Sequence, residues 1–524
     1  MKEIFSSDKG ALVANRSSKT MGDGLSIANE PFVADKKDSI FALFTFLLGF
    51  LFIRWVFFSW QGWGVSVFTI AYSLSITIYF RKKGINIPVS AYFWLASIIL
   101  IGISYSLYMN KGLEPWRSLL LFCSAVYYVI IASGRLILSN TSNWIFLDGV
   151  NGLLVIPFKN FGCQYKSLSL FQYKKKGLIK QILSVALGLL LALSVTGMVF
   201  PLLMRADSGG FYIIASHMYE FYQRIQNHFM NTIVNIILAI PVAAYLFGLV
   251  AGCAHGRGCK TFKRENIQYA IDSIRILDFA TVYTALGLIC CLYLLFIGSQ
   301  IPYFFSAFVG KRPDGWQIYS EYARSGFFEL CQIATINLFL LLVANVTCKK
   351  SQGNNTVLKI LNIMLSMITL LLIATALSKM GLYIKAYGLS IRRLLPCIFM
   401  LFLTVVFVGI IILQKRKFSI IRLSVITAVF MICVLSLLNP DSFVANYNAN
   451  RYLSGTLGDF DVSILYQSGP AGVDAALRVY EETDDGRLKA ELRTYIDNQK
   501  RESEKTLGLP KDSLQNFLIR QKTK

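Results

Sequence analysis

The sequence has few charged residues and contains long stretches with none. Only 15% of the 524 residues are Asp, Glu, Lys or Arg, whereas 55% are hydrophobic. Soluble globular domains usually carry about 25% charged residues. Histidine is rarer still, with three in the whole chain. This composition excludes a water-soluble protein, and the lack of histidine inside the apolar stretches weakens any proton relay built on imidazole groups.

Sequence motifs of the common nucleotide-binding and hydrolytic sites are also missing. The chain contains no GxxxxGK[ST], HExxH, GxSxG or GxGxxG pattern in a suitable setting. The one group that resembles a metal site is Cys253, His255 and Cys259, but a structural zinc site needs four ligands and this connector is basic. We therefore expect no metal and no cofactor, and no ATP-driven transport by this chain alone. The ten cysteines lie mostly in apolar runs and imply no disulfide framework.

Long apolar stretches, separated by short basic or polar connectors, fill the chain between Ile40 and Leu438. Each has roughly 18 to 25 residues, which is the length of a helix that crosses a bilayer. A backbone surrounded by lipid must satisfy its own hydrogen bonds, so these stretches predict helices. The fold class is therefore all-α, a polytopic transmembrane helix bundle of about 11 spans with a small helical C-terminal tail domain. The predicted spans are 40–59, 64–80, 88–108, 117–134, 180–203, 231–252, 279–302, 327–347, 356–377, 394–413 and 418–438.

The composition changes twice along the chain, which predicts three parts. Residues 1–39 read as a disordered cytoplasmic arm, 40–438 as the transmembrane bundle and 439–524 as a small soluble helical tail. Basic residues follow the second, fourth, sixth, eighth and tenth spans, so the positive-inside rule places the N-terminus in the cytoplasm and the tail outside. The connector with Lys379, Lys385, Arg392 and Arg393 departs from this rule. The basic residues behind the net charge of +23 thus orient the helices and interact with anionic lipid head groups. Nucleic acid is not an expected partner.

Several segments read as elements at the membrane surface. Apolar residues recur every three or four positions from Phe211 to Ile225, which predicts a helix lying flat on the outer surface. The stretch 144–158 is too short to span comfortably and should rest on or dip into the cytoplasmic leaflet. A lid over a cavity is the alternative for either segment. Trp55, Trp60 and Trp63 resemble an aromatic belt. In the tail, Asp512 and Gln515 form a capping-box pattern that predicts a last helix.

Two segments with charged side chains border apolar runs on the same predicted face. YSEYARSGFFEL leads into the eighth span, and SKMGLYIKAYGLSIRR ends the ninth. A carboxylate at membrane depth needs a partner, so we predict a polar site between these spans. A structural ion-pair network that locks the two helices explains the same residues equally well. The site would consist of Tyr322, Arg324, Glu329, Lys379, Tyr383 and Tyr387.

A third polar segment, NPDSFVANYNANR, comes directly after the last span. Pro440 should end that span, and Asp441 should cap the next element of the chain. The side-chain donors of the segment either pin the tail onto the helices or form the rim of the polar site. The residues of this tail motif are Asn439, Asp441, Tyr447, Asn448 and Arg451.

These three segments, in this order, resemble the recurring motifs of the membrane proteins grouped as domain of unknown function 4173, which is related to domain of unknown function 4153. The resemblance covers roughly the C-terminal half, with Lys379 where Arg is expected and Ser390 where Thr is common. It implies a bacterial multi-pass protein of the plasma membrane and names no activity.

Three functions fit the residues. The first is binding or transport of a small solute or a lipid head group at the mouth of the bundle. The second is a non-catalytic envelope or signalling scaffold that contacts a protein partner through its tail. The third, an enzyme acting on lipid-linked substrates with Glu329 or Asp441 as base, ranks last because no second carboxylate or metal cluster accompanies either residue. The lipid bilayer is a partner in all three.

Overall fold

The computed structural model describes residues 32–58, 60–137, 141–172, 211–258, 264–309, 326–349 and 355–523, together with four separate positions between 184 and 199. Within these ranges the regular elements are helices, and the one β-type contact is an isolated bridge between Leu277 and Cys348. Ten of the described helices are long and apolar enough to cross a membrane. The predicted all-α, multi-pass membrane fold is therefore confirmed. The predicted span 180–203 lies outside the described ranges.

Each predicted span among the described residues corresponds to one helix, and most boundaries agree within a few residues. The first span is α2, which continues as a π-helix over Phe52–Phe57. The ten long apolar helices are α2 (Lys36–Leu51), α3 (Trp63–Lys82), α4 (Val89–Leu107), α5 (Glu114–Ala132), α10 (Phe211–Ala254), α12 (Phe279–Val309), α14 (Phe327–Thr347), α15 (Thr356–Tyr387), α16 (Ile391–Leu413) and α17 (Ile420–Leu438).

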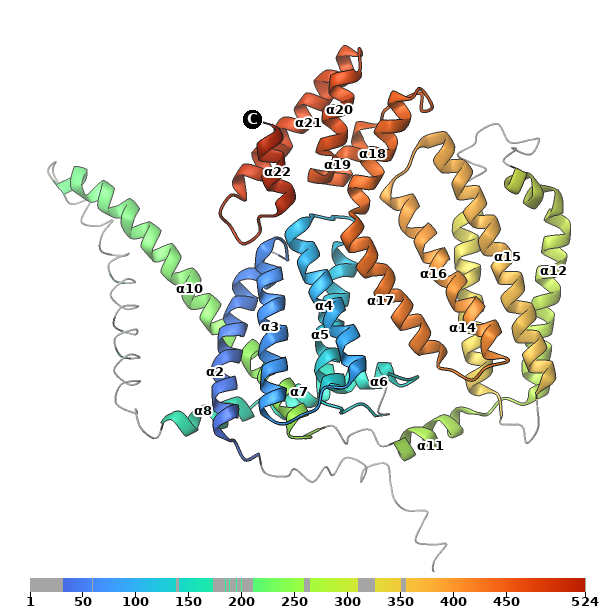
Figure 1. The fold of residues 1–524 in the computed structure, drawn as a ribbon, viewed down its shortest axis with the longest axis horizontal. Coiled ribbons are helices and arrows are strands. Elements are labelled where there is room, and N and C mark those ends of the chain that lie inside the picture. Colours follow the sequence, from blue (N-terminus) through green and yellow to red (C-terminus); the bar gives the residue numbers. More distant parts are fainter. Residues whose placement is uncertain are drawn as a thin grey trace, which may run out of the picture. The chain divides into compact units, whose positions relative to one another are not determined.

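The shorter helices lie in the connectors and in the tail. Those of the connectors are α6 (Ile145–Val150), a π-helix (Asn151–Val155), α7 (Ile156–Lys159), α8 (Cys163–Gln172) and α11 (Arg264–Ile274). Those of the tail are α18 (Pro440–Leu453), α19 (Val462–Ser468), a 3-10 helix (Gly469–Gly472), α20 (Val473–Glu482), α21 (Gly486–Lys505) and α22 (Leu514–Lys522) (Figure 1).

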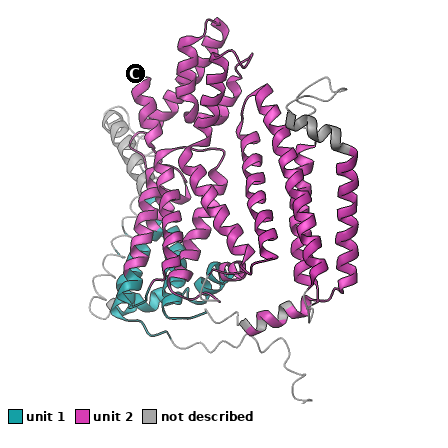
Figure 2. Cartoon of the chain, turned by 45° about the vertical axis from the view of Figure 1, so that its right-hand side comes forward, with its two compact units in different colours: residues 1–49, 79–86, 150–263 teal, residues 50–78, 87–149, 264–524 magenta. Residues whose placement is uncertain are grey.

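The chain divides into two compact units (Figure 2). Unit 1 comprises residues 1–49, 79–86 and 150–263, and unit 2 comprises residues 50–78, 87–149 and 264–524. Unit 2 thus contains α4, α5 and all the helices from α11 to the C-terminus.

In unit 1, small residues let helices approach closely. A Cβ on Gly49 of α2 would lie 2.7 Å from the carbonyl oxygen of Ala239 in α10, and one on Gly248 would lie 2.5 Å from that of Pro157. Such glycine contacts are typical of helix pairs in membranes, where lipid gives no hydrophobic drive for association. The helix α10 runs from Phe211 to Ala254 without a break. The prediction of a separate flat helix over 211–225 is therefore wrong, because these residues are continuous with the span after them.

In unit 2, α12, α14, α15 and α16 share an apolar core that includes Leu286, Phe327, Leu372 and Phe407. A polar contact crosses this core: Asn337 accepts a hydrogen bond from the Tyr293 hydroxyl at 2.7 Å and donates one to Thr369 at 2.9 Å. Because a buried amide without partners would be costly in lipid, these bonds fix how the helices meet.

The tail helices pack around their own apolar core and are tied to the start of α3. Leu465, Val479, Leu492 and Tyr495 are buried in this core. The predicted capping box is wrong, because Ser513 caps α22 by accepting from the Asn516 N–H. The carboxylate and amide side chains of that pattern are used in other contacts.

Candidate functional site

A buried carboxylate, that of Asp441, lies where α17 gives way to α18. Asn439 has a left-handed backbone conformation with φ of 49°, and its side chain accepts a hydrogen bond from the Ser442 N–H at the start of α18. Pro440 fits the first position of that helix, where its missing N–H is not needed. The capping role predicted for Asp441 therefore belongs to Asn439, and the Asp441 side chain turns into the protein instead.

The side chain of Asp441 is completely buried, and neither of its oxygens accepts a hydrogen bond of normal geometry from the described residues. Asn110, in the loop between α4 and α5, is equally buried. Its amide nitrogen donates to the Ser436 carbonyl at 3.2 Å, while its Oδ1 accepts no hydrogen bond from the described chain. Three acceptor oxygens in this region of unit 2 thus have capacity for a donor.

Arg117 brings a buried positive charge to the same region. Its guanidinium carbon lies 4.0 Å from the centre of the Tyr105 ring, and its Nη1 donates to the Tyr108 carbonyl at 3.2 Å. Its Nε, also buried, donates no hydrogen bond to a described residue. We call Asn110, Arg117 and Asp441 the Asp441 cluster. Asn110 and Arg117 are not among the residues predicted from the sequence, although an arginine at the edge of a predicted span is a usable signal.

Burial raises the pKa of Asp441 from 3.8 to about 6. The nearby backbone N–H groups of Gly112 and Lys111, and the positive charge of Arg117, oppose part of this rise. A carboxyl group with this pKa changes its charge just below neutral pH, so the cluster can gain or lose a proton under ordinary conditions.

The loop that carries Asn110 is held from several sides. The Met109 N–H donates to Oε1 of Gln515 in α22 at 3.0 Å. A Cβ on Gly112 would lie 2.7 Å from Cγ2 of Ile391, and one on Gly469 would lie 2.9 Å from Cε of Lys111. The tail and the start of α16 thus pack directly on this loop and keep it over Asp441.

Two other residues of the tail motif tie α18 to the corner between α15 and α16. Asn448 accepts from the Leu389 N–H and donates to the Leu389 carbonyl, both at 2.7 Å. Arg451 donates to the Ile384 carbonyl at 3.1 Å and to the Thr456 carbonyl at 2.7 Å. Tyr447 lies beside Arg451, with 5.8 Å between the guanidinium carbon and the ring centre.

The predicted polar site between α14 and α15 is only partly described. Tyr322 and Arg324 lie outside the described ranges. Glu329 is exposed in the first turn of α14 and attracts the charge of Lys379.

The two tyrosines of that predicted site take part in a different contact. The rings of Tyr383 and Tyr387 meet edge to face at 5.3 Å, and Arg393 stacks on Tyr383 at 4.3 Å. Arg393 also donates to the carbonyl of Tyr387 at 2.9 Å. These contacts cap the end of α15 and hold the corner that precedes α16.

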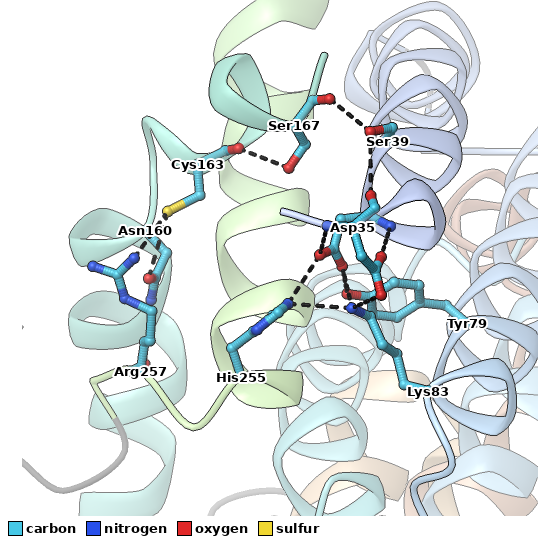
Figure 3. A network of polar contacts seen from close by, with 10 residues as sticks. Asp35, Ser39, Tyr79, Lys83, Asn160, Cys163, Ser167, His255 and Arg257 are labelled. Atoms are coloured by element: carbon cyan, nitrogen blue, oxygen red, sulfur yellow. Dashed lines mark hydrogen bonds and ion pairs between the residues drawn. The ribbon is translucent and has the colours of Figure 1, made fainter. Parts of the chain in front are cut away.

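A second cluster of charged groups lies in unit 1, where α3 and α10 end and α2 begins (Figure 3). Asp38 is fully buried and accepts from the Tyr79 hydroxyl at 2.6 Å. It forms an ion pair with Lys83 at 2.8 Å, and Nε2 of His255 lies 3.1 Å from its other oxygen. Lys83 also pairs with Asp35 at 3.0 Å. We call these five residues the Asp38 cluster.

Both carboxylate oxygens of Asp38 have partners within the protein, since Oδ1 contacts Tyr79 and Lys83, and Oδ2 contacts the Asp35 N–H and His255. A fully partnered buried carboxylate is typical of a structural clamp. His255, which the sequence groups with Cys253 and Cys259, lies 3.1 Å from the Asp38 carboxylate instead. No group of His, Cys, Asp or Glu side chains suited to a metal occurs among the described residues, and Cys259 lies outside them. The two buried carboxylates therefore differ: Asp38 is saturated, and Asp441 is not.

No curated protein and no solved structure matches this chain. A family model does match it, described as domain of unknown function (DUF4153), over residues 95–479. This range includes Asn110, Arg117, Asp441, Asn448 and Arg451. This chain, whose described part has ten helices able to cross a membrane, therefore belongs to the DUF4153 family.

Proposed function

We propose that this protein binds a small solute or a lipid head group at the Asp441 cluster and moves it into or across the bilayer. The observation that supports this proposal is the buried Asp441 carboxylate, whose two oxygens accept no normal hydrogen bond from the described residues. Burying a carboxylate without well-formed hydrogen bonds costs free energy, so such a group is expected to have a function.

The donors and acceptors of the cluster indicate the chemistry of the ligand. The two carboxylate oxygens of Asp441 and Oδ1 of Asn110 can each accept a hydrogen bond from a ligand, whereas the Nε–H of Arg117 can donate one. A protonated primary amine offers three N–H donors and a positive charge. We therefore expect a ligand with an ammonium group, either as a free solute or in a lipid head group.

The charged connectors support an orientation for this activity. The tail is attached to α3 at Trp63, the first residue of the helix. At the other end of α3 lie the basic residues Arg81, Lys82 and Lys83. With these basic residues in the cytoplasm of a bacterial cell, the tail and the Asp441 cluster would face outward and the N-terminus inward.

The proposal is tested with ethanolamine and choline, which carry the same charge but differ in N–H donors. In the solute arm, each compound is added to purified protein, and the melting temperature and the uptake into proteoliposomes are measured. In the lipid arm, the melting temperature of the protein in nanodiscs of phosphatidylethanolamine is compared with that in nanodiscs of phosphatidylcholine. Ethanolamine or its lipid should stabilise the wild-type protein and choline should not.

Asp148 provides a matched control. It is buried, burial raises its pKa to about 6, and one of its oxygens has no hydrogen-bond partner among the described residues. The Asp441→Asn variant should lose the response to the amine, and Asp148→Asn should retain it. Equal responses in both variants, or no response of the wild-type protein in either arm, would refute the proposal. Stabilisation without uptake would limit the function to binding.

A further inference from the structure

The loop between α21 and α22, and α22 itself, expose apolar side chains although they belong to a tail that reads as soluble. Leu507 is 66% exposed, Leu514 47% and Phe517 48%. Leu509 and Leu518 are exposed as well. The other face of α22 is buried through Asn516 and Ile519. The exposed residues of α22, Leu514, Phe517 and Leu518, recur at three and four positions and so share one face of the helix, and the loop before it adds two more exposed leucines.

Hydrogen bonds fix the position of this segment relative to a membrane span. The backbone N–H groups of Trp63 and Gly64, at the first turn of α3, donate to the carbonyls of Asp512 at 3.0 Å and Pro510 at 2.8 Å. The indole of Trp63 donates to the Leu509 carbonyl at 3.1 Å. Glycine is required at this contact, because a Cβ on Gly62 would lie 2.3 Å from the carbonyl carbon of Lys511.

The end of the bundle at which this segment is attached also carries exposed aromatic side chains. Phe57 and Phe58 are more than half exposed, and Trp63 is 38% exposed. Tryptophan at the end of a span is typical of the boundary between lipid and water, and exposed phenylalanine beside it adds apolar surface there. Figure 1 shows the segment on the side of the tail nearest α3 and α4, at the same end of these helices.

We propose that residues 507–518 rest in the lipid interface of the leaflet on the tail side, with Leu507, Leu514 and Phe517 among the acyl chains. A partner protein or a second copy of the chain would need the same surface, but a segment fixed to the first turn of a span meets lipid without any further partner. The tail is then a membrane-associated domain that binds lipid through residues 507–518, and only the surface away from this segment faces water.

This contact also links the membrane to the Asp441 cluster. Gln515 of α22 accepts from the Met109 N–H, and Met109 precedes Asn110 of the cluster. When residues 507–518 are held at a fixed depth, they keep the loop between α4 and α5 in place. Lipid at this site therefore supports the geometry of the Asp441 cluster.

The test is photo-crosslinking of the full-length protein in nanodiscs of defined lipid. Leu514 or Phe517 is replaced by p-benzoylphenylalanine, which inserts into nearby C–H bonds under ultraviolet light, and adducts are identified by intact-mass spectrometry. The control position is Arg487, whose side chain is 89% exposed at the other end of α21. That position lies about 28 Å along the helix from the loop, at 1.5 Å per residue.

We expect lipid adducts at both α22 positions, at least tenfold more abundant than at Arg487, in protein that elutes as a single species. Crosslinks to a second copy or to another protein, or adducts no more frequent than at Arg487, would overturn the proposal. Since all three positions are exposed, the replacements leave the tail core intact. These results do not depend on whether Asp441 binds an amine.

Discussion

Replacing Asp441 with Asn should make the protein more stable at neutral and alkaline pH, although it removes a group that we place in the binding site. The reason is that the native protein holds this carboxyl group in a place that disfavours its charge. Burial raises its pKa from 3.8 to about 6 in the folded protein. Each pH unit of difference between the folded and unfolded pKa is worth about 1.4 kcal/mol. The full shift therefore corresponds to about 3 kcal/mol.

The direction of the effect is set by the raised pKa. Below about pH 4, both the folded and the unfolded protein carry a protonated Asp441, and the group costs nothing. Between about pH 4 and pH 6, the unfolded protein ionises Asp441 while the folded protein keeps it protonated, so stability falls across this range. Above the folded pKa of about 6 both states are ionised, and the loss is complete. Asparagine has nearly the same shape and no charge. The variant should therefore gain up to about 3 kcal/mol over the wild-type protein at pH 8 and almost nothing at pH 4.

The assay is equilibrium unfolding of both proteins in bicelles, titrated with sodium dodecyl sulfate and repeated at several pH values between 4 and 8. The quantity of interest is the difference in unfolding free energy between the variant and the wild-type protein. It should increase with pH and level off above about pH 7. A difference that does not change with pH, or an Asn variant that is less stable at pH 8, would refute the reasoning. The second result would mean that the ionised carboxylate has a stabilising partner.

The remaining predictions concern the contacts that hold the tail and the Asp38 cluster. Asn448→Ala should release the tail and lower the free energy of unfolding by about 2–4 kcal/mol, because it leaves the buried N–H and C=O of Leu389 unpaired. Limited proteolysis should then cleave the tail faster, and an unchanged cleavage rate would contradict this prediction. Gly388→Ala should weaken the same contact, since φ is +74° and the new Cβ would lie 2.6 Å from Oδ1 of Asn448, and wild-type thermal stability in this variant would be inconsistent with that geometry. Asp38→Asn should lower the free energy of unfolding by about 3–5 kcal/mol. The same change at its half-exposed neighbour Asp35 should lower it by about 1 kcal/mol or less. Equal losses in the two variants would argue against a fully partnered Asp38.

The helices were predictable because lipid leaves a spanning segment only one conformation. Every predicted span within the described ranges is a helix, since long apolar runs have no other means of satisfying their backbone groups. The prediction failed where the apolar pattern alone had to decide between two helical arrangements. The stripe from Phe211 to Ile225 suits a flat helix, yet it continues into α10 without a break. Local periodicity cannot specify where one helix ends if no cap or proline marks the boundary.

The candidate site was less predictable because its contacts join distant parts of the chain. Asp441 was identified from its place in a polar segment after the last span, but Asn110 and Arg117 come from a much earlier part of the sequence, around the connector between α4 and α5. The bond from Asn110 to Ser436 joins residues 326 positions apart, and that from Met109 to Gln515 joins residues 406 positions apart. No periodicity within a segment encodes such pairs. The role of Asn439 as the cap of α18 depends on a left-handed backbone conformation, which asparagine permits without requiring it.

The most direct test of the proposed binding site is a cryo-electron microscopy map of the full-length protein in nanodiscs prepared from its native membrane. The map should show a non-protein group within hydrogen-bond distance of the Asp441 carboxylate, and this density should disappear in the Asp441→Asn variant while persisting in Asp148→Asn. A wild-type map in which the Asp441 oxygens contact only the backbone of Lys111 and Gly112, or ordered water, would contradict the account.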